Sequence, residues 1–427
     1  MHREVPGGLR HDREAKEMTD LSLDVLHNAV VGAAAAFRCR RRLQPAGGPG
    51  DKVFPPTFAG AMYAIEKRRI PGRDEPVTCV LLDSVQSQAN RMEAALQEAV
   101  DAGRLRLPLI VVDFSEHDPT GDLEADKAAG RLIDKVGRIT SLQVPHRLAD
   151  ATLRYSQLDG QPFRKSPRGK TLNAVGLANA TPLFELCPTA LVFGMWDSTG
   201  PKGGLGAKFE RALVSEIVGV GAAWEADYRA RGVRRDPFET SKNVRVIPSE
   251  DRTTFRVAEA NERGAVQPSK LGLSSVPFEL PNSGLTIEYA EQTTTLSLIA
   301  LRRLRFPLDG QPPRGETDVA ARTVLAALGL TAATLAFEAG TDLRSRCLLW
   351  PDGPMVWELL DRPGAEPQRF TLSGDEAVAL LCKAAARAKE QGLPWPEEPI
   401  VLKPLPELVE LVRLSQIEAM KETAPEA

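Results

Sequence analysis

Glycine and basic residues gather in the stretch from Asp197 to Arg211, where together they could contact a phosphate group. The residues of interest are Gly200, Lys202, Gly203, Gly204, Gly206, Lys208 and Arg211. The short apolar run 190–196 before them predicts a buried strand, and the apolar spacing over 209–218 predicts a helix. A glycine-rich turn between a strand and a helix start offers backbone N–H groups and a favourable dipole to an anion. The alternative is a flexible surface turn whose lysines are solvated.

Two well-known phosphate motifs are absent from this stretch. A Walker A loop requires Ser or Thr after its lysine, but Lys208 is followed by Phe209. A dinucleotide-binding G-x-G-x-x-G that starts at Gly204 and Gly206 would also need glycine at position 209. The hypothesis of a scaffold that binds a free nucleotide is therefore supported by the loop alone. Contact with a nucleic-acid backbone is the stronger hypothesis.

Three further groups of side chains could bind phosphate or ribose. They are Arg38, Arg40 and Arg41 in an arginine cluster, Gln88, Asn90 and Arg91 after a strand, and Arg302 and Arg303 near the end of 286–305. We expect a helix over 21–37, capped by Asp20 or Ser22, before the first group. A strand over 77–82 and a helix through Val100 flank the second. The alternatives are a solvated charged face for the first group and a capped helix with a polar face for the second.

The candidate catalytic residues in the sequence are single aspartates. Asp83 and Asp197 each follow a strand candidate, so a metal-dependent ribonuclease is the alternative function, although such residues are more often turn formers or caps. Ser198 and Ser215 lack a nucleophile motif, and the five histidines and five cysteines have no metal-ligand spacing. We therefore expect no catalytic residue, no metal and no cofactor. The scattered cysteines are typical of reduced, buried thiols.

Bulk composition restricts the class of protein. The chain has 427 residues, 42% hydrophobic and 26% charged, with a net charge of −3. It is long enough for two or three domains, or for one domain with large insertions. A uniformly basic nucleic-acid binder is excluded, so contacts must come from local patches. The aromatic content of 5% disfavours broad base-stacking surfaces. No apolar run suggests a membrane span and the N-terminus has no apolar signal region, so we expect a soluble, cytoplasmic protein.

The remaining patterns predict a mixture of helices and strands. We expect strands at 107–114, 334–337 and 348–350, and helices at 318–330, 373–391 and 405–420, whereas 286–305 begins β-like and continues with alternating or helical apolar residues. Two basic segments, 138–170 and 228–257, read as insertions, the second as an irregular segment or hairpin. The expected class is α+β.

Three long motifs carry a resemblance to a known family. LVFGMWDSTGPKGGLGAKFERALVSEIVG, LLDSVQSQANRMEAAL and IEYAEQTTTLSLIALRRLRFP occur in this order. With them the chain resembles, over roughly 21–391, the type I-G (formerly I-U) CRISPR-associated backbone subunit of the repeat-associated mysterious protein superfamily. Its counterparts are the Cas-seven family subunits that line guide RNA in Cascade complexes.

The resemblance implies a modified RNA-recognition-motif (ferredoxin-like) core with large insertions over 20–398, followed by an acidic C-terminal helix or tail over 399–427. It implies a non-catalytic subunit of a ribonucleoprotein for antiviral defence, with an inserted hairpin that kinks the RNA. Its partners would be crRNA, target DNA paired with that RNA, further copies of itself and other subunits of the effector complex, with no membrane. On this sequence we expect the RNA-contacting residues to be Arg38, Arg40, Arg41, Gln88, Asn90, Arg91, Lys202, Gly203, Gly204, Lys208, Arg211, Arg302 and Arg303.

Overall fold

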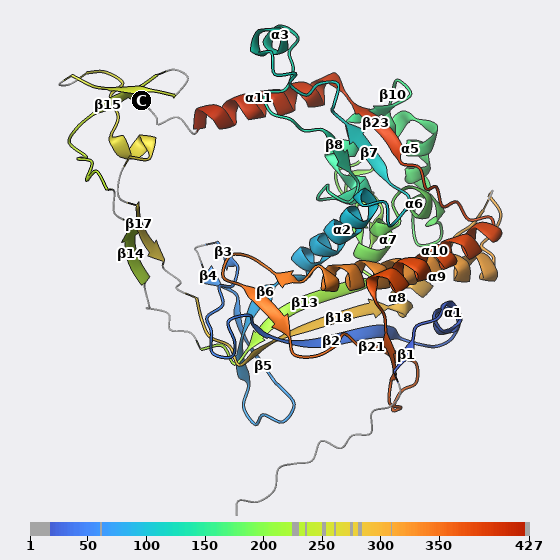
Figure 1. Ribbon diagram of the computed structural model, residues 1–427. Helices are drawn as coiled ribbons and strands as arrows, with labels where there is room; N and C mark the ends of the chain where they lie inside the picture. Colours follow the sequence, from blue (N-terminus) through green and yellow to red (C-terminus); the bar gives the residue numbers. More distant parts are fainter. Residues whose placement is uncertain are drawn as a thin grey trace, which may run out of the picture.

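Two β-sheets organise the chain in the computed structural model, which describes residues 18–422 apart from 60–61, 224–229, 235–236, 250–252, 260–261, 274–275, 281–283 and 309 (Figure 1). The larger sheet has ten strands in the order β1-β22-β21-β2-β18-β13-β6-β5, with β20 joining β2 to β19. Its strands are β1 (Thr19–Asp20), β2 (Ala36–Pro45), β5 (Ile65–Arg68), β6 (Val77–Asp83), β13 (Leu213–Val220), β18 (Tyr289–Ser297), β19 (Thr341–Asp342), β20 (Leu348–Pro351), β21 (Trp357–Leu360) and β22 (Gln368–Thr371). All its pairings are antiparallel except that of β1 with β22.

The second sheet has five strands and draws on distant parts of the chain. Its order is β10-β9-β23-β7-β8. The strands are β7 (Ile110–Asp113), β8 (Arg138–Thr140), β9 (Ser156–Leu158), β10 (Gln161–Pro162) and β23 (Ile400–Pro404). Because β23 pairs with both β7 and β9, the segment expected to be a C-terminal tail begins with an internal strand of this sheet.

Short strand pairs complete the sheet structure. They are β3 (Thr57–Phe58) with β4 (Met62–Tyr63), β11 (Met195–Trp196) with β12 (Lys208–Phe209), β14 (Ala230–Arg234) with β17 (Val276–Leu280), and β15 (Val246–Pro248) with β16 (Phe255–Val257). Within the basic segment 228–257, β15 and β16 pair as a hairpin, whereas β14 pairs with β17 beyond it. Figure 1 shows β14, β15 and β17 standing apart from both larger sheets.

The helices are distributed over both sheets, and those nearest the large sheet cover only one of its faces (Figure 1). The helices are α1 (Leu23–Val31), α2 (Val85–Asp101), α3 (Leu123–Ala128), α4 (Ala151–Arg154), α5 (Pro167–Thr171), α6 (Thr181–Leu186), α7 (Thr189–Phe193), α8 (Leu298–Arg302), α9 (Gly315–Glu338), α10 (Gly374–Glu390) and α11 (Pro406–Glu422). Helix α9 packs against α1, α2 and α10, and Figure 1 shows α9 and α10 running side by side over the sheet. The mixture of helix and sheet confirms the expected α+β class.

The central helix α9 is apolar on every side because it is covered on every side. Nineteen of its residues are buried, and alanine makes up much of its sequence, so neighbouring elements approach closely. By length and composition α9 could cross a membrane, contrary to the sequence-based expectation, but 89% of its most apolar window is buried inside the protein. Core helices of this kind pass the same test.

Several segments expected to be strands are helices in the structure, or the reverse. The run 190–196 forms the short helix α7 and the two-residue strand β11, and the helix expected after the glycine loop is strand β13. The expected helix at 21–37 ends at Val31, so the arginine cluster lies on β2. The strand expected at 334–337 is the last turn of α9. The strand at 77–82, its following helix, and the helices at 373–391 and 405–420 are confirmed.

Candidate nucleic-acid interface

The glycine loop from Asp197 to Ala207 closes between β11 and β12 and wraps around the side chain of Asp197. A Cβ on Gly206 would lie 1.9 Å from the Asp197 carbonyl oxygen, and one on Gly200 would lie 2.2 Å from Asp197 Oδ1. Asp197 is buried and its Oδ2 lies 3.1 Å from Arg164 Nη2. These two glycines are therefore required for close packing around Asp197, Gly200 against its carboxylate and Gly206 against its backbone carbonyl. Because β13 rather than a helix follows, the loop has no helix dipole directed at an anion.

Two arginines of the basic segment 138–170, Arg154 and Arg164, bind this loop to the rest of the protein. Arg154 donates hydrogen bonds to the Thr199 carbonyl and, at 2.8 Å, to Thr199 Oγ1. Arg164 forms the ion pair with Asp197 described above. Lys202 donates to the Asn173 carbonyl, so part of the positive charge expected to face a ligand is used within the protein.

Two cations that are distant in sequence meet beside the loop. Lys208 and Arg303 both line a hollow of about 280 Å³, together with Glu210 and apolar residues. Arg303 Nη1 lies 2.8 Å from Glu210 Oε2, and the ammonium of Lys208 lies 5.1 Å from the centre of the Trp196 ring. Arg303 and Lys208 are exposed and could also reach a phosphate.

The other predicted residues near the loop differ in exposure. Arg211, Gly204 and Lys202 are exposed, and Gly203 is half-buried with a φ of 54°. Arg302 instead donates to the carbonyls of Gly32 and Ala34 at 2.8 and 2.6 Å, so it holds the turn that follows α1.

The arginine cluster is divided between the two faces of the large sheet because residues alternate along β2. Arg38 and Arg40 point to the outer face, away from the helices, where Arg38 pairs with Glu358 and Arg40 with Glu291, both at 2.7 Å. Arg41 points inward and is only 8% exposed. Its guanidinium lies 4.7 Å from the centre of the Phe337 ring, and burial lowers its pKa. Arg41 thus lies beneath the sheet, out of reach of a ligand on the outer face.

The second predicted group belongs to a polar network between α2 and the sheet. Asp83, which is 1% exposed, accepts hydrogen bonds from Gln88 Nε2 at 2.6 Å and Arg91 Nε at 3.0 Å. Gln88 Oε1 in turn accepts from Ser215 Oγ and Gln292 Nε2 at 2.9 and 2.8 Å. Gln88 is therefore a structural link in this arrangement.

The two other polar residues of α2 are less enclosed. Arg91 is half-buried and donates to the carbonyls of Asp342 and Leu343, whereas Asn90 is exposed. Only Asn90 of this group presents a side chain wholly to solvent. Ser84 caps α2, as a strand-to-helix junction of this kind predicts.

Sequence reasoning missed several residues of the outer face. Arg42 stacks over Tyr289, with its guanidinium carbon 3.8 Å from the ring centre. Arg68 pairs with Glu66 and Glu216 at 2.6 and 2.9 Å, and Arg369 lies 3.6 Å from Glu358. The alternation of apolar and charged residues in Phe37–Leu43 was the signal that could have revealed this face.

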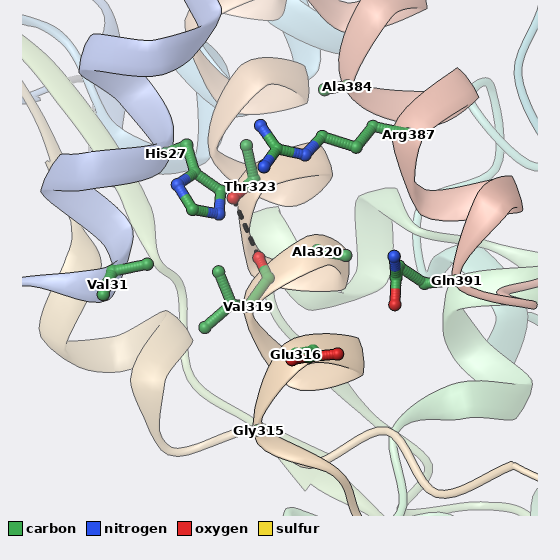
Figure 2. A pocket seen from close by; sticks show the side chains of 10 residues that line it. All are labelled: His27, Val31, Gly315, Glu316, Val319, Ala320, Thr323, Ala384, Arg387 and Gln391. Carbon is green, nitrogen blue, oxygen red and sulfur yellow. Dashed lines mark hydrogen bonds between the residues drawn. The ribbon is translucent and has the colours of Figure 1, made fainter.

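Another hollow, of about 600 Å³, lies between α1, α9 and α10. Figure 2 shows His27 of α1 and Arg387 of α10 reaching over a floor that includes Val319 and Ala320. Within the described part of the chain, no group of three or more His, Cys, Asp or Glu residues is arranged to hold a metal ion.

The comparison with protein families concerns the first half of this structure. Residues 37–224 match the family described as CRISPR-associated protein GSU0053, a range that contains all but the first residue of β2, and also β6, α2, the glycine loop and β13. This similarity supports a CRISPR-associated protein with a role in CRISPR defence, acting with other CRISPR components. No curated protein matches the chain.

Proposed function

We propose that the chain is a non-catalytic, guide-RNA-binding backbone subunit of a type I-G CRISPR surveillance complex. In this role it polymerises along the crRNA, presents it for pairing with target DNA, and works in the cytoplasm with other subunits. The observation that carries the proposal is the similarity to CRISPR-associated proteins over residues 37–224. Two features of the fold and its charges lend it support.

The first feature is the strand order at the centre of the large sheet. Along the chain, β2, helix α2, β13, β18, helix α9 and β21 follow one another, with further elements inserted between them. In the sheet the four strands lie in the order β21-β2-β18-β13, each antiparallel to its neighbour, and both helices pack on one face. A βαββαβ unit in this order has ferredoxin-like topology, which supports an RNA-recognition-motif-like core.

The second feature is the distribution of positive charge. Exposed cations lie in separate groups, among them Lys208, Arg211 and Arg303 beside the glycine loop and Arg40 on the outer sheet face. The net charge of −3 means that these groups bind a phosphate backbone only locally. Such a surface suits a subunit that must contact RNA and also pack against other proteins.

The proposal of a non-catalytic role rests on the partners of the two candidate aspartates. Asp83 is bonded to Gln88 and Arg91, and Arg344 Nη2 lies 3.5 Å from its other oxygen. Asp197 is paired with Arg164. A buried carboxylate already compensated by guanidinium groups is a poor ligand for a divalent cation. The alternative, a metal-dependent ribonuclease using Asp83 or Asp197, would require these pairs to open.

The test is to purify the protein from cells that also express a CRISPR array and to sequence the nucleic acid that accompanies it. We expect discrete repeat–spacer RNAs, several protein copies per RNA, and an affinity that falls steeply with salt. Protein that carries no RNA would overturn the proposal. RNA that shortens when a divalent metal is added, and that does so no longer in Asp83→Ala or Asp197→Ala, would favour the ribonuclease.

A further inference from the structure

Tyr289, Gln44 and Trp350 lie in one row across the outer face of the large sheet. Gln44 of β2 is paired with Trp350 of β20. On the other side of β2, Leu43 is paired with Ala290, so the next position along places Gln44 beside Tyr289. Gln44 Nε2 also donates to the carbonyl of Glu288, the residue before Tyr289. Neighbouring strands lie about 4.8 Å apart, so the two aromatic residues flank Gln44 on one continuous surface.

The two rings differ in what covers them. Trp350 is 70% exposed, compared with 53% for Trp196. Tyr289 packs against a small apolar cluster on the same face, formed by Cys79, Val218 and Val220. Above it lies the exposed guanidinium of Arg42, 3.8 Å from the ring centre. The row thus presents an open indole, with Gln44 between it and the tyrosine on which the Arg42 guanidinium stacks.

We propose that Trp350 and the Arg42–Tyr289 pair form a stacking platform for unpaired nucleobases. An indole ring and a planar guanidinium both stack on the π-face of any base, so a platform of this kind accepts single-stranded RNA without selecting its sequence. The inference rests on the proposed RNA-binding function. It adds contacts with bases to the phosphate contacts proposed for the same face of the sheet.

The charges around the platform favour a nucleic acid over an apolar protein segment. Arg40 and Arg38 lie further along the same face of β2, each beside a glutamate that leaves it partly exposed. A phosphate backbone that followed β2 from the platform would meet both guanidinium groups. The neighbouring exposed residue Leu348, on the same strand as Trp350, offers a position at which apolar area can be removed without removing a ring.

The experiment measures the binding of a short single-stranded oligo(A) RNA and of an abasic strand of the same length. We expect Trp350→Ala to bind oligo(A) roughly 5- to 150-fold more weakly and to bind the abasic strand as the unchanged protein does. Trp350→Phe should recover most of the affinity, and Leu348→Ala, the matched control, should leave it unchanged. In the unchanged protein, oligo(A) should quench tryptophan fluorescence by an amount that is missing in Trp350→Phe, a readout that does not depend on the alanine variant folding.

Three results would overturn the platform. Equal affinity of Trp350→Ala and the unchanged protein for oligo(A) would dismiss it while leaving RNA binding intact. Altered self-association or altered binding of a protein subunit, with unchanged RNA affinity, would assign the face to a protein contact. Failure of the unchanged protein to bind either strand would remove the proposed function as well.

Discussion

The guanidinium of Arg147 connects helix α2 to the segment that supports the glycine loop. Its Nε and Nη2 lie 2.6 and 2.7 Å from the two carboxylate oxygens of Glu93, and its Nη1 donates to the Gly194 carbonyl. Arg147 is 8% exposed and adopts a left-handed backbone with φ of 51°. A non-glycine residue holds such a conformation only where its surroundings determine it. The pair therefore fixes how residues 147–194 meet α2.

We expect Arg147→Met to lower the free energy of unfolding by about 3–5 kcal/mol at neutral pH, because Glu93 is then a buried charge without a partner. Burial already raises the pKa of Glu93 above its ordinary value of 4.5. Without Arg147 that pKa rises further, so the carboxyl is neutral in the folded variant at mildly acid pH. The loss should consequently shrink as pH falls through the variant's raised pKa. Urea denaturation at neutral and acid pH measures both losses, and equal losses would contradict the argument.

Two neighbouring glycines provide a second test at the residue scale. Gly206→Ala would place a Cβ 1.9 Å from the Asp197 carbonyl oxygen, whereas Gly204 has no neighbouring atom within 4 Å of such a Cβ and no positive φ. We expect Gly206→Ala to displace the loop and Gly204→Ala to leave it unchanged. Limited proteolysis and amide hydrogen exchange at 197–207 measure the difference. Similar exchange in both variants would show that contact with Asp197 does not hold the loop.

At the scale of elements, alternation along β2 gives adjacent arginines different roles. We expect Arg40→Gln to leave the unfolding midpoint nearly unchanged, because its pair with Glu291 is exposed. If Arg40 contacts phosphate, the slope of log affinity against log salt should also fall by about one. Arg41→Gln should instead destabilise the fold, since Arg41 packs on Phe337 beneath the sheet. Thermal unfolding and salt-dependent RNA binding of both variants test this, and a destabilised Arg40→Gln would count against it.

The hydroxyl of Thr331 forms a hydrogen bond between helices α9 and α10. Thr331 Oγ1 lies 2.8 Å from the Ala327 carbonyl in its own helix and 2.9 Å from the Ala377 carbonyl of α10. Replacement by valine keeps the shape and leaves the Ala377 carbonyl without that donor, so we expect a loss of about 1–3 kcal/mol. Thr323→Val is the matched control, because Thr323 bonds within α9 to the Val319 carbonyl. Calorimetry of the two variants should rank Thr331→Val as the less stable.

The elements that were predicted correctly carry several local signals at once. Strand β6 and helix α2 are separated by the capping residue Ser84, and α10 begins with a capping box formed by Ser373 and Glu376. Strand β13 was mistaken for a helix because Phe209, Leu213 and Ile217 recur every four residues, a spacing that also fits the two-residue period of a strand. A buried run as short as 190–196 gives no periodicity by which to choose.

The site was predictable by residue type more than by orientation. Lys208 and Arg303 were both selected, yet nothing in the sequence placed them around one hollow. Gln88 and Arg41 were selected as surface contacts because polarity was visible, whereas the partners that bury them come from β13, β18 and α9. Arg42 and Trp350 were not selected as contacts because the pairing of β2 with β20 joins distant parts of the chain. The pairing of strands that lie far apart in the chain cannot be predicted from a local sequence pattern.

At the scale of the whole molecule, both sheets pair strands that lie far apart in the sequence. The four central strands of the large sheet and the helices between them are assembled from segments between Ala36 and Leu360. The second sheet places β23 between β7 and β9, although these precede it by most of the chain. Leu402 of β23 is wholly buried there. The C-terminal segment is therefore part of the core of this sheet.

The position of β23 has a consequence for biosynthesis. During translation, β7 and β9 emerge early. Their backbone groups that face β23 in the native sheet remain unpaired until residues 400–404 have been synthesised. Throughout that interval they form open sheet edges, which are the usual sites of mispairing and of chaperone capture. On nascent chains stalled before residue 400, we expect a protease to cut around 110–113 and 156–158. Chains released with β23 in place should resist cleavage at both positions.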